Sequence, residues 1–247
     1  MTTLEDIGLD SDAIYADIRD GYISMRTHPR ESDLRIYNYT AKTQYERAWT
    51  KERLACRGLI VWYDGTPPLI GARPFPKFFN LSELESIPDG PFVAQEKMDG
   101  SLGIVYMAPG GVPAVATRGS FNSEQAIWAT EYLQSKIALY ESAREFFRNE
   151  LTLLVEIIYP ENRIVIDYGE MRDLVALTAI DNATGLDVSI DAWPGRKAET
   201  YSDFTLDLFR EQDGEGPHAG GFNREGVVLR WEDGTRAKVK FEEYVRL

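Results

Sequence analysis

The chain has 247 residues, of which 43% are hydrophobic and 27% charged, so it can bury a substantial core and is typical of a soluble globular protein. Its 27 Lys and Arg residues against 40 Asp and Glu residues give a net charge of −13, which excludes broad, sequence-independent coating of nucleic acid but permits a local basic groove. No apolar run approaches the roughly 20 residues of a membrane helix, and the N-terminus lacks the basic and apolar regions of a signal peptide.

The first eighty residues predict one amphipathic helix followed by strands and an ordered loop. Residues 4–20 place apolar side chains at helical spacing among many acids. Residues 34–39 alternate like a strand, residues 43–54 predict a short polar helix or ordered loop, and residues 56–63 predict an apolar strand closed by an Asp-Gly turn. Two close prolines exclude a central strand or helix over residues 72–80, which we expect to form an ordered loop.

Phe92–Tyr106 contains two apolar runs on either side of Asp99-Gly100, a pattern typical of a β-hairpin. A hairpin gives no reason for Lys97 at the end of the incoming run. A lysine held by a rigid turn beside apolar walls loses hydration, which favours the neutral, nucleophilic amine. This stretch alone favours the plain hairpin over a catalytic lysine.

The second half of the chain predicts one long helix and several strands. The helix begins at Ser123-Glu124 and continues to about Phe147, with apolar positions that include Ile127, Leu133, Ile137, Leu139 and Phe146. Residues 211–222, rich in Gly, Asp and Glu, are typical of a mobile surface loop. Many strands with few helices indicate an α+β fold with antiparallel sheets. The strands are predicted over residues 151–159, 162–168, 174–180, 225–231 and 236–241, the last two as a hairpin.

Cysteine and histidine contribute little to the predicted chemistry. The single cysteine, Cys56, excludes an intramolecular disulfide, fits a reducing cytoplasm and is expected to be a small buried hydrophobe. His28 and His218 each lie beside a proline and are expected in solvated loops, so histidine-based catalysis has little support. Without a Cys/His cluster, zinc is not expected.

Several charged residues occur at unusual places in apolar strands. Glu156 lies within one, where it is either buried at a cost or faces a cleft, and Glu225 begins another. Lys238 and Lys240 alternate in the last strand, so both side chains share one face. Taken singly, each is an ordinary strand-edge charge or solvated residue. Together with Lys97 and the cations Arg57, Lys77 and Arg118, they supply a nucleophile, two carboxylates for a metal and positive charge for a polyphosphate.

The motifs also resemble those of a known family. Lys97-Met98-Asp99-Gly100-Ser101 is similar to the KxDG-S motif of covalent nucleotidyltransferases, which comprise ATP-dependent ligases and mRNA capping enzymes. Further segments narrow the resemblance to the phage-type RNA ligases of the first class, the RNA ligase 1 family, from about residue 37 to residue 247. These are Cys56-Arg57-Gly58, residues 77–81, residues 119–120 followed by 123–126, Pro160 with residues 162–165, residues 225–228 and residues 238–240.

This resemblance implies an α+β nucleotidyltransferase (ATP-grasp-like) domain over residues 1–247, with antiparallel β-sheets flanked by helices. It implies that Lys97 attacks the α-phosphorus of ATP and retains AMP, while Lys238 and Lys240 grip the α-phosphate. Mg²⁺ or Mn²⁺ would be bound by Glu156 and Glu225, with Asp99 acting through water. The nucleotide-binding positions that it implies are Tyr37, Arg57, Lys77, Glu96, Asp99, Gly100, Ser101, Arg118, Glu156 and Val228. Family members often carry lysine where this chain has Arg118.

The expected activity is that of an ATP-dependent RNA ligase, which joins a 5′-phosphate to a 3′-hydroxyl in RNA repair without a membrane or an obligate protein partner. A DNA ligase core, an mRNA capping nucleotidyltransferase and a non-catalytic nucleotide- or RNA-binding module remain alternatives. Full-length family members carry a further C-terminal domain beyond the Lys238/Lys240 strand, and we expect that domain to be absent from this chain. Self-adenylylation should survive its absence better than the sealing of RNA ends.

Overall fold

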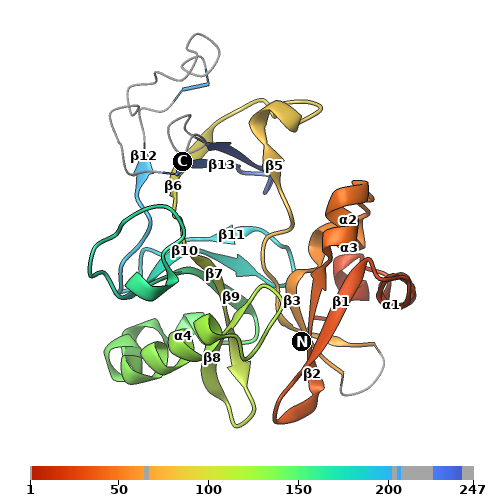
Figure 1. Ribbon diagram of the computed structural model, residues 1–247, viewed down its shortest axis with the longest axis horizontal. Coiled ribbons are helices and arrows are strands. Elements are labelled where there is room, and N and C mark those ends of the chain that lie inside the picture. Colours follow the sequence, from red (N-terminus) through yellow and green to blue (C-terminus); the bar gives the residue numbers. More distant parts are fainter. Residues whose placement is uncertain (1, 64–66, 202–204, 207–224, 241–247) are drawn as a thin grey trace. The chain divides into compact units, whose positions relative to one another are not determined.

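The computed structural model describes residues 2–63, 67–201, 205–206 and 225–240. The chain divides into two units that each combine segments distant in the sequence (Figure 1). Unit 1 comprises Met1–Lys77, Ser101–Ile157 and Leu174–Arg196, and unit 2 comprises Phe78–Gly100, Ile158–Asp173 and Lys197–Leu247. The prediction of a single nucleotidyltransferase domain over the whole chain stays a prediction.

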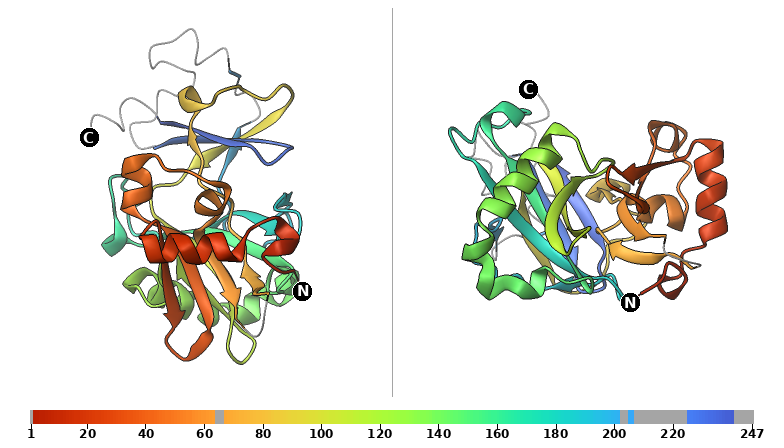
Figure 2. Two further views of the ribbon diagram at one scale, coloured as in Figure 1. Left: turned by 90° about the vertical axis from the view of Figure 1, so that its right-hand side faces the viewer. Right: turned by 90° about the horizontal axis from the view of Figure 1, so that it is seen from below.

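The first sheet of unit 1 has four strands in the order β1-β2-β3-β4, with antiparallel pairing throughout. Figure 2 shows helix α1, in red, crossing one face of this sheet. Apolar side chains of α1 and of the segment before it pack there against strand residues, and Cys56 lies in the same cluster, fully buried as predicted. The elements are η1 (Glu5–Ile7), α1 (Ser11–Asp20), β1 (Ile23–His28), β2 (Glu31–Tyr39), α2 (Ala41–Glu46), α3 (Lys51–Ala55), β3 (Arg57–Trp62) and β4 (Leu69–Ala72).

Two helix predictions in this part of the chain are corrected. Residues 4–20 do not form one helix, because Gly8 adopts a left-handed φ of 77° that ends η1, and Asp10 then caps α1 by accepting from the N–H groups of residues 12–13. Residues 43–54 are covered by two short helices, because Arg47 adopts a left-handed φ of 50° at the end of α2.

The second sheet of unit 1 has the strand order β11-β10-β9-β7-β8. The helix predicted over residues 123–147 is right only in its first half, since α4 is followed by a 3₁₀ segment with non-helical backbone at Tyr140 and Ala143. The predicted apolar positions Ile127 and Leu139 are 49% and 68% exposed, so they are not core residues. The elements are β7 (Ser101–Ala108), β8 (Val112–Thr117), α4 (Glu124–Ser135), η3 (Ile137–Phe146), β9 (Leu151–Ile158), β10 (Asp173–Asp181) and β11 (Asp187–Val188).

The described residues of unit 2 form one sheet, in the order β12-β6-β13-β14-β5. Only β14 and β5 pair in parallel, and the other neighbours are antiparallel. Its core is formed by Ala94, Val227, Leu229, Trp231 and Ala237. The elements are β5 (Phe79–Asn80), η2 (Leu81–Glu83), β6 (Phe92–Lys97), η4 (Pro160–Asn162), β12 (Thr200–Tyr201), β13 (Gly226–Trp231) and β14 (Arg236–Lys240).

The hairpin predicted over Phe92–Tyr106 is wrong, because the two strands belong to different sheets. Strand β6 pairs with β12 and β13, whereas β7 pairs with β8 and β9. The Asp99-Gly100 segment is therefore the point at which the chain passes from unit 2 to unit 1. The final hairpin and the strands at 151–159 and 174–180 are confirmed, as is the α+β class with antiparallel sheets and few helices.

Two further predictions are corrected and two fall outside the described residues. Residues 162–168 form no strand, for a reason given with the site below. His28 is 8% exposed and makes edge contacts with the rings of Tyr106 and Phe121, so it is a core residue. The predicted loop at 211–222 and His218 within it lie outside the described residues. Among the residues that the structure describes, no helix is long and apolar enough to span a membrane.

Candidate active site

Three neighbouring strands of unit 2 align two of the predicted lysines. Gly226, the first residue of β13, lies opposite Lys97 of β6 on one side and Lys240 of β14 on the other. Its φ is 153°, and a Cβ atom at this position would overlap the carbonyl oxygen of Val239. Only glycine therefore allows β13 to begin this close to β14. The close approach brings the ends of the three strands together.

Glu225, immediately before β13, links these two lysines. Lys97 Nζ lies 2.6 Å from Glu225 Oε2, and Lys240 Nζ lies 3.3 Å from Glu225 Oε1. The Glu225 residue is only 3% exposed. A carboxylate this deeply buried needs charged partners to offset its lost hydration, and the two ammonium groups provide them.

Lys238 completes what we call the lysine cluster, defined as Lys97, Glu225, Lys238 and Lys240. Burial lowers the pKa of Lys238, and the positive charges of Lys240 and Lys97 lower it further, while Glu83 and Glu225 oppose the shift. The charge interaction between Lys238 and Lys240 agrees with the shared face that strand alternation predicts. The cluster is therefore crowded with positive charge.

Asp99 holds the segment that follows strand β9. Its Oδ2 accepts hydrogen bonds from the backbone N–H groups of Val165 and Ile166 at 2.8 and 2.7 Å, and its own N–H donates to the hydroxyl of Tyr168. These amides are used by a carboxylate instead of a neighbouring strand, which explains why residues 162–168 do not form one. Asp99 also contributes to the lining of a cavity of about 270 Å³, with Pro160, Arg163 and Tyr168 among the other lining residues.

The predicted cations of unit 1 form a second group. Burial lowers the pKa of Arg57 to about 10, helped by the charge of Arg118, while Tyr39 and Glu156 act in the opposite direction. Arg57 therefore stays cationic at neutral pH. Arg118 Nη1 donates to the hydroxyl of Tyr39 at 2.8 Å, and Glu156 is 9% exposed within β9. We call Arg57, Arg118, Tyr39 and Glu156 the arginine cluster.

Lys77 lies beside two aromatic rings near this cluster. Its Nζ is 5.9 Å from the ring centroids of both Tyr39 and Trp49, within the range of a cation–π interaction. The two rings contact each other edge to face, with centroids 5.0 Å apart. Tyr39 and Trp49 were not predicted as site residues. Sequence spacing does not show that these two rings lie near the arginine cluster. This follows from the pairing of β2 with β3, in which Asn38 lies opposite Arg57.

The structure does not bring every predicted residue to these clusters. Tyr37 is 0% exposed and belongs to the hydrophobic core of unit 1. Glu96 lies opposite Val227, so strand alternation puts its side chain on the sheet face away from Lys97. Ser101 and Val228 pair with Ile157 and Lys238, and Gly100 ends a segment of unit 2. The nucleotide-binding roles predicted for these residues, and for Asp99, stay predictions.

Glu156 and Glu225 are the buried carboxylates that were predicted to bind a divalent metal. Among the residues that the structure describes, no three His, Cys, Asp or Glu side chains group together as a metal site. Mg²⁺ retains several water ligands and is often bound by one or two carboxylates together with substrate phosphates. The oxygen donors of Glu225 fit that coordination. Glu156 belongs to unit 1 and Glu225 to unit 2.

Sequence comparison identifies the family to which this chain belongs. A sequence profile described as RNA ligase matches residues 55–245, which is more than three quarters of the chain. The chain belongs to the RNA ligase family.

Individual relatives agree with this assignment. A Thermovibrio ammonificans protein assigned as an RNA ligase is 33% identical over 154 residues, which cover 60% of this chain and 39% of that protein. The chain therefore spans about two fifths of the length of this curated relative.

Solved structures resemble the fold across almost the whole chain. An archaeal ATP-dependent RNA ligase matches with a TM-score of 0.62 at 16% identity, covering 98% of this chain and 64% of that one. An Aquifex aeolicus protein assigned as an ATP-dependent DNA ligase matches with a TM-score of 0.61 at 16% identity, covering 95% of this chain and 63% of that one. At such low identity these likenesses show the fold alone.

Proposed function

We propose that this chain is the nucleotidyltransferase part of an ATP-dependent RNA ligase of the RNA ligase 1 type, with Lys97 as the residue that carries AMP. The observation that supports this most strongly is the ion pair of Lys97 with the buried carboxylate of Glu225, in a group that also contains Lys238 and Lys240. A surface lysine needs no buried acid and no neighbouring cations. Neighbouring cations favour the neutral, nucleophilic form of a lysine, and the buried acid holds its side chain in position.

The proposed reaction has three steps. Lys97, after losing a proton, attacks the α-phosphorus of ATP, so that an N–P bond forms and the P–O bond to pyrophosphate breaks. The RNA 5′-phosphate next attacks the same phosphorus, which breaks the N–P bond and returns Lys97. The RNA 3′-hydroxyl then attacks the activated 5′-phosphate, loses its proton and displaces AMP. The family membership supports the joining of RNA ends, and RNA repair is the proposed purpose.

The lysine cluster fits the demands of the first step. Phosphoryl transfer depends on positioning and on stabilising the negative charge that spreads over the phosphate oxygens. Lys238 and Lys240 supply positive charge beside the nucleophile, and Glu225 holds the Lys97 ammonium group at 2.6 Å. In the arginine cluster, Arg57 and Arg118 are candidate contacts for the triphosphate or for the RNA 5′-phosphate.

Mg²⁺ or Mn²⁺ is the proposed metal, and Glu225 in unit 2 and Glu156 in unit 1 are each a proposed ligand through their carboxylate oxygens. When bound, the metal supplies charge neutralisation for the phosphate groups of ATP. Glu225 holds and orients the Lys97 side chain. Because Glu225 is buried, bulk water has little access to its carboxylate. Asp99, two residues after the nucleophile, is tied to the segment that follows β9 by hydrogen bonds from the N–H groups of Val165 and Ile166.

Covalent labelling tests the proposal. Wild-type protein incubated with ATP labelled at the α-phosphate and with Mg²⁺ should retain the label after denaturation, and Lys97→Ala should not. Lys197→Ala, which removes an exposed lysine of the same unit, is the matched control and should label normally. Lys240→Ala and Glu156→Ala should lose labelling while remaining folded. A wild type that takes up no label, or a Lys97→Ala variant that labels fully, contradicts the proposal.

Substrate comparison separates the related activities. Labelling by GTP in preference to ATP would indicate a capping enzyme, and joining of nicked DNA in preference to RNA would indicate a DNA ligase. Binding of ATP without covalent labelling would indicate a non-catalytic module. An RNA ligase should label from ATP and join a 5′-phosphorylated RNA strand to a 3′-hydroxyl end.

A further inference from the structure

The segment that carries α2 and α3 has an unusual charge for this chain. Residues 41–57 contain five Lys or Arg residues against two Asp or Glu residues, whereas the whole chain has a net charge of −13. A local basic surface on an acidic protein attracts polyanions to one place and repels them elsewhere. The positions of these cations decide whether such a surface is available.

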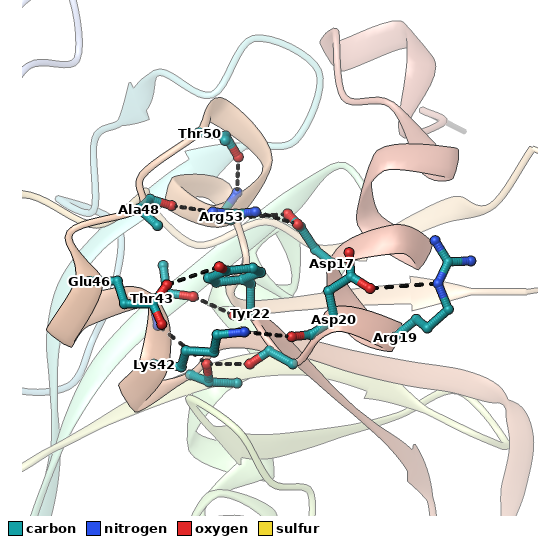
Figure 3. Close-up of polar contacts among 12 residues, drawn as sticks. Asp17, Arg19, Asp20, Tyr22, Lys42, Thr43, Glu46, Ala48, Thr50 and Arg53 are labelled. Atoms are coloured by element: carbon teal, nitrogen blue, oxygen red, sulfur yellow. Dashed lines mark hydrogen bonds and ion pairs between the residues drawn. The ribbon is translucent and has the colours of Figure 1, made fainter.

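The inward-facing residues of this segment are used to fix it to the rest of unit 1. Arg53 binds both carboxylate oxygens of Asp17 at 2.8 and 2.6 Å and stacks 3.8 Å from the ring centroid of Tyr22 (Figure 3). Lys42 donates to the carbonyl oxygen of Asp20 and lies 4.0 Å from the same ring. The Tyr22 hydroxyl and carbonyl oxygen make further bonds to Glu46 and Thr43. These contacts hold the segment in one position.

Two side chains of the segment take no part in this network. Tyr45 is 91% exposed, and Arg47 is also exposed. Within the described part of the chain, neither side chain makes a hydrogen bond, an ion pair or a ring contact. Arg47 also occupies the left-handed conformation that usually favours glycine or asparagine at the end of a helix. The fold therefore presents an aromatic ring and a cation on a rigid support and does not use either one for packing.

These two residues continue directly into the aromatic and cationic residues of the candidate site. The backbone N–H of Trp49 donates to the carbonyl oxygen of Arg47, and the Trp49 ring contacts Tyr39, which accepts a hydrogen bond from Arg118. Tyr45, Arg47 and Trp49 thus alternate along the chain, and Trp49 contacts the aromatic and cationic residues of the candidate site inside unit 1. We call this the cation–aromatic row, and it consists of Tyr45, Arg47, Trp49, Tyr39, Lys77 and Arg118.

We propose that the cation–aromatic row binds the single-stranded RNA adjoining the reactive 5′-phosphate, with a base stacked on Tyr45 and a backbone phosphate neutralised by Arg47. This inference rests on the proposed function. Every base has a flat π-face and every linkage a negative charge, so alternating aromatic rings and cations fit a nucleic-acid strand. The row ends at Arg118, which is a candidate contact for the 5′-phosphate, and this indicates which end of the strand it binds.

Binding of a short 5′-phosphorylated oligoadenylate with a 3′ fluorophore, measured by fluorescence anisotropy without ATP, tests the row. Tyr45→Ala should weaken binding by about 5- to 160-fold, and Tyr45→Phe should retain it, because one stacked base contributes about 1–3 kcal/mol. Arg47→Ala should reduce the slope of log K against log salt concentration by about 0.7, the value for one single-strand phosphate contact. Leu139→Ala and Arg148→Ala, matched exposed positions outside the row, should bind like wild type.

The labelling assay separates this inference from the proposed function. Tyr45→Ala and Arg47→Ala should take up AMP at the wild-type rate and fail only in steps that need RNA. If the wild type takes up AMP and both variants bind the oligoadenylate as tightly as wild type, the row is not an RNA surface, although the ligase assignment stands. If the wild type takes up no AMP, the proposed function fails whatever the binding assay gives. If Leu139→Ala weakened oligoadenylate binding as much as Tyr45→Ala, that result would also overturn the proposal.

Discussion

The pairing of Lys97 with Glu225 makes a quantitative prediction about the lysine cluster. Replacing Glu225 by Gln keeps the shape of the side chain and removes its charge, while Lys97→Met and Lys240→Met remove each positive partner in turn. Two double-mutant cycles then give the coupling free energy of Glu225 with each lysine separately. The two coupling energies should differ, because the two ion pairs differ in distance and in exposure.

The magnitudes follow from the geometry. With an effective dielectric constant of about 20, charges at 2.6 Å and 3.3 Å attract by about 6 and about 5 kcal/mol. Most of this attraction is offset by the lost hydration of the buried carboxylate and by the ordering of the lysines. The Lys240 side chain is 35% exposed against 23% for Lys97, so water screens its pair more strongly. We expect a coupling of about 1.5–3 kcal/mol for Lys97 and about 0.5–1 kcal/mol for Lys240.

Hydrogen exchange of the β13 amides is the appropriate assay, because it reports the opening free energy of unit 2 even if the two units unfold separately. Each variant is measured at neutral pH and low salt. A coupling energy for Lys240 that equals or exceeds that for Lys97 would refute the reasoning. So would a Lys97 coupling below about 0.5 kcal/mol, the level of an ordinary surface pair.

Three further substitutions change the free energy of unfolding, which urea denaturation measures. Gly58→Ala should lower it by about 2–4 kcal/mol, because Gly58 has a φ of 89° and a Cβ there overlaps the side chain of Ile104. Asp99→Asn should lower it by about 1–3 kcal/mol, because a neutral amide accepts the N–H bonds of residues 165–166 less strongly than a carboxylate. Lys238→Met should raise it at neutral pH, because the lowered pKa of Lys238 means that folding disfavours its charge.

Each of these predictions has a contradicting result. Adding Ile104→Val removes the overlapping Cδ1 atom and should restore part of the stability lost in Gly58→Ala, so no recovery would contradict the steric explanation. An Asp99→Asn variant as stable as wild type would show that the charge of the carboxylate is unimportant. The increase in the free energy of unfolding caused by Lys238→Met should be full below the pKa of Lys238 in the folded protein. It should shrink as pH rises toward the ordinary lysine pKa of 10.5 and vanish above it. A gain that grows with pH would contradict the assigned cause.

Much of the fold can be predicted from local sequence patterns. The predictions fail where a segment distant in the sequence forms the hydrogen bonds that a local pattern would assign to a neighbouring strand. Residues 162–168 alternate like a strand, yet the amides of Val165 and Ile166 bind the carboxylate of Asp99, which lies more than sixty positions earlier. The Asp99-Gly100 turn likewise resembles a hairpin turn. Whether the strands beside it pair with each other is decided by competition with β13 and β9, which sequence spacing does not reveal.

The candidate site was predictable to the extent that strand alternation determines it. Lys238 and Lys240 share a face because they are two positions apart, and Glu225 lies near them because its strand neighbours theirs. The choice between Tyr37 and Tyr39 was not predictable in the same way. Both residues lie on β2, and only the tertiary packing of α1 against the sheet buries Tyr37 in the core and leaves Tyr39 beside Arg118.

Gly226 gives the lysine cluster a property that no side chain provides. Because the residue between Lys97 and Lys240 has no Cβ atom, the backbones themselves set how closely the positive charges are spaced. A larger residue would push β14 away from β13 and increase the distance between the lysine charges. The glycine therefore keeps the lysines close enough to repel one another, and under the proposed function a bound polyphosphate would relieve this repulsion. The spacing of the strands would in this way contribute to the affinity of the lysine cluster for an anion.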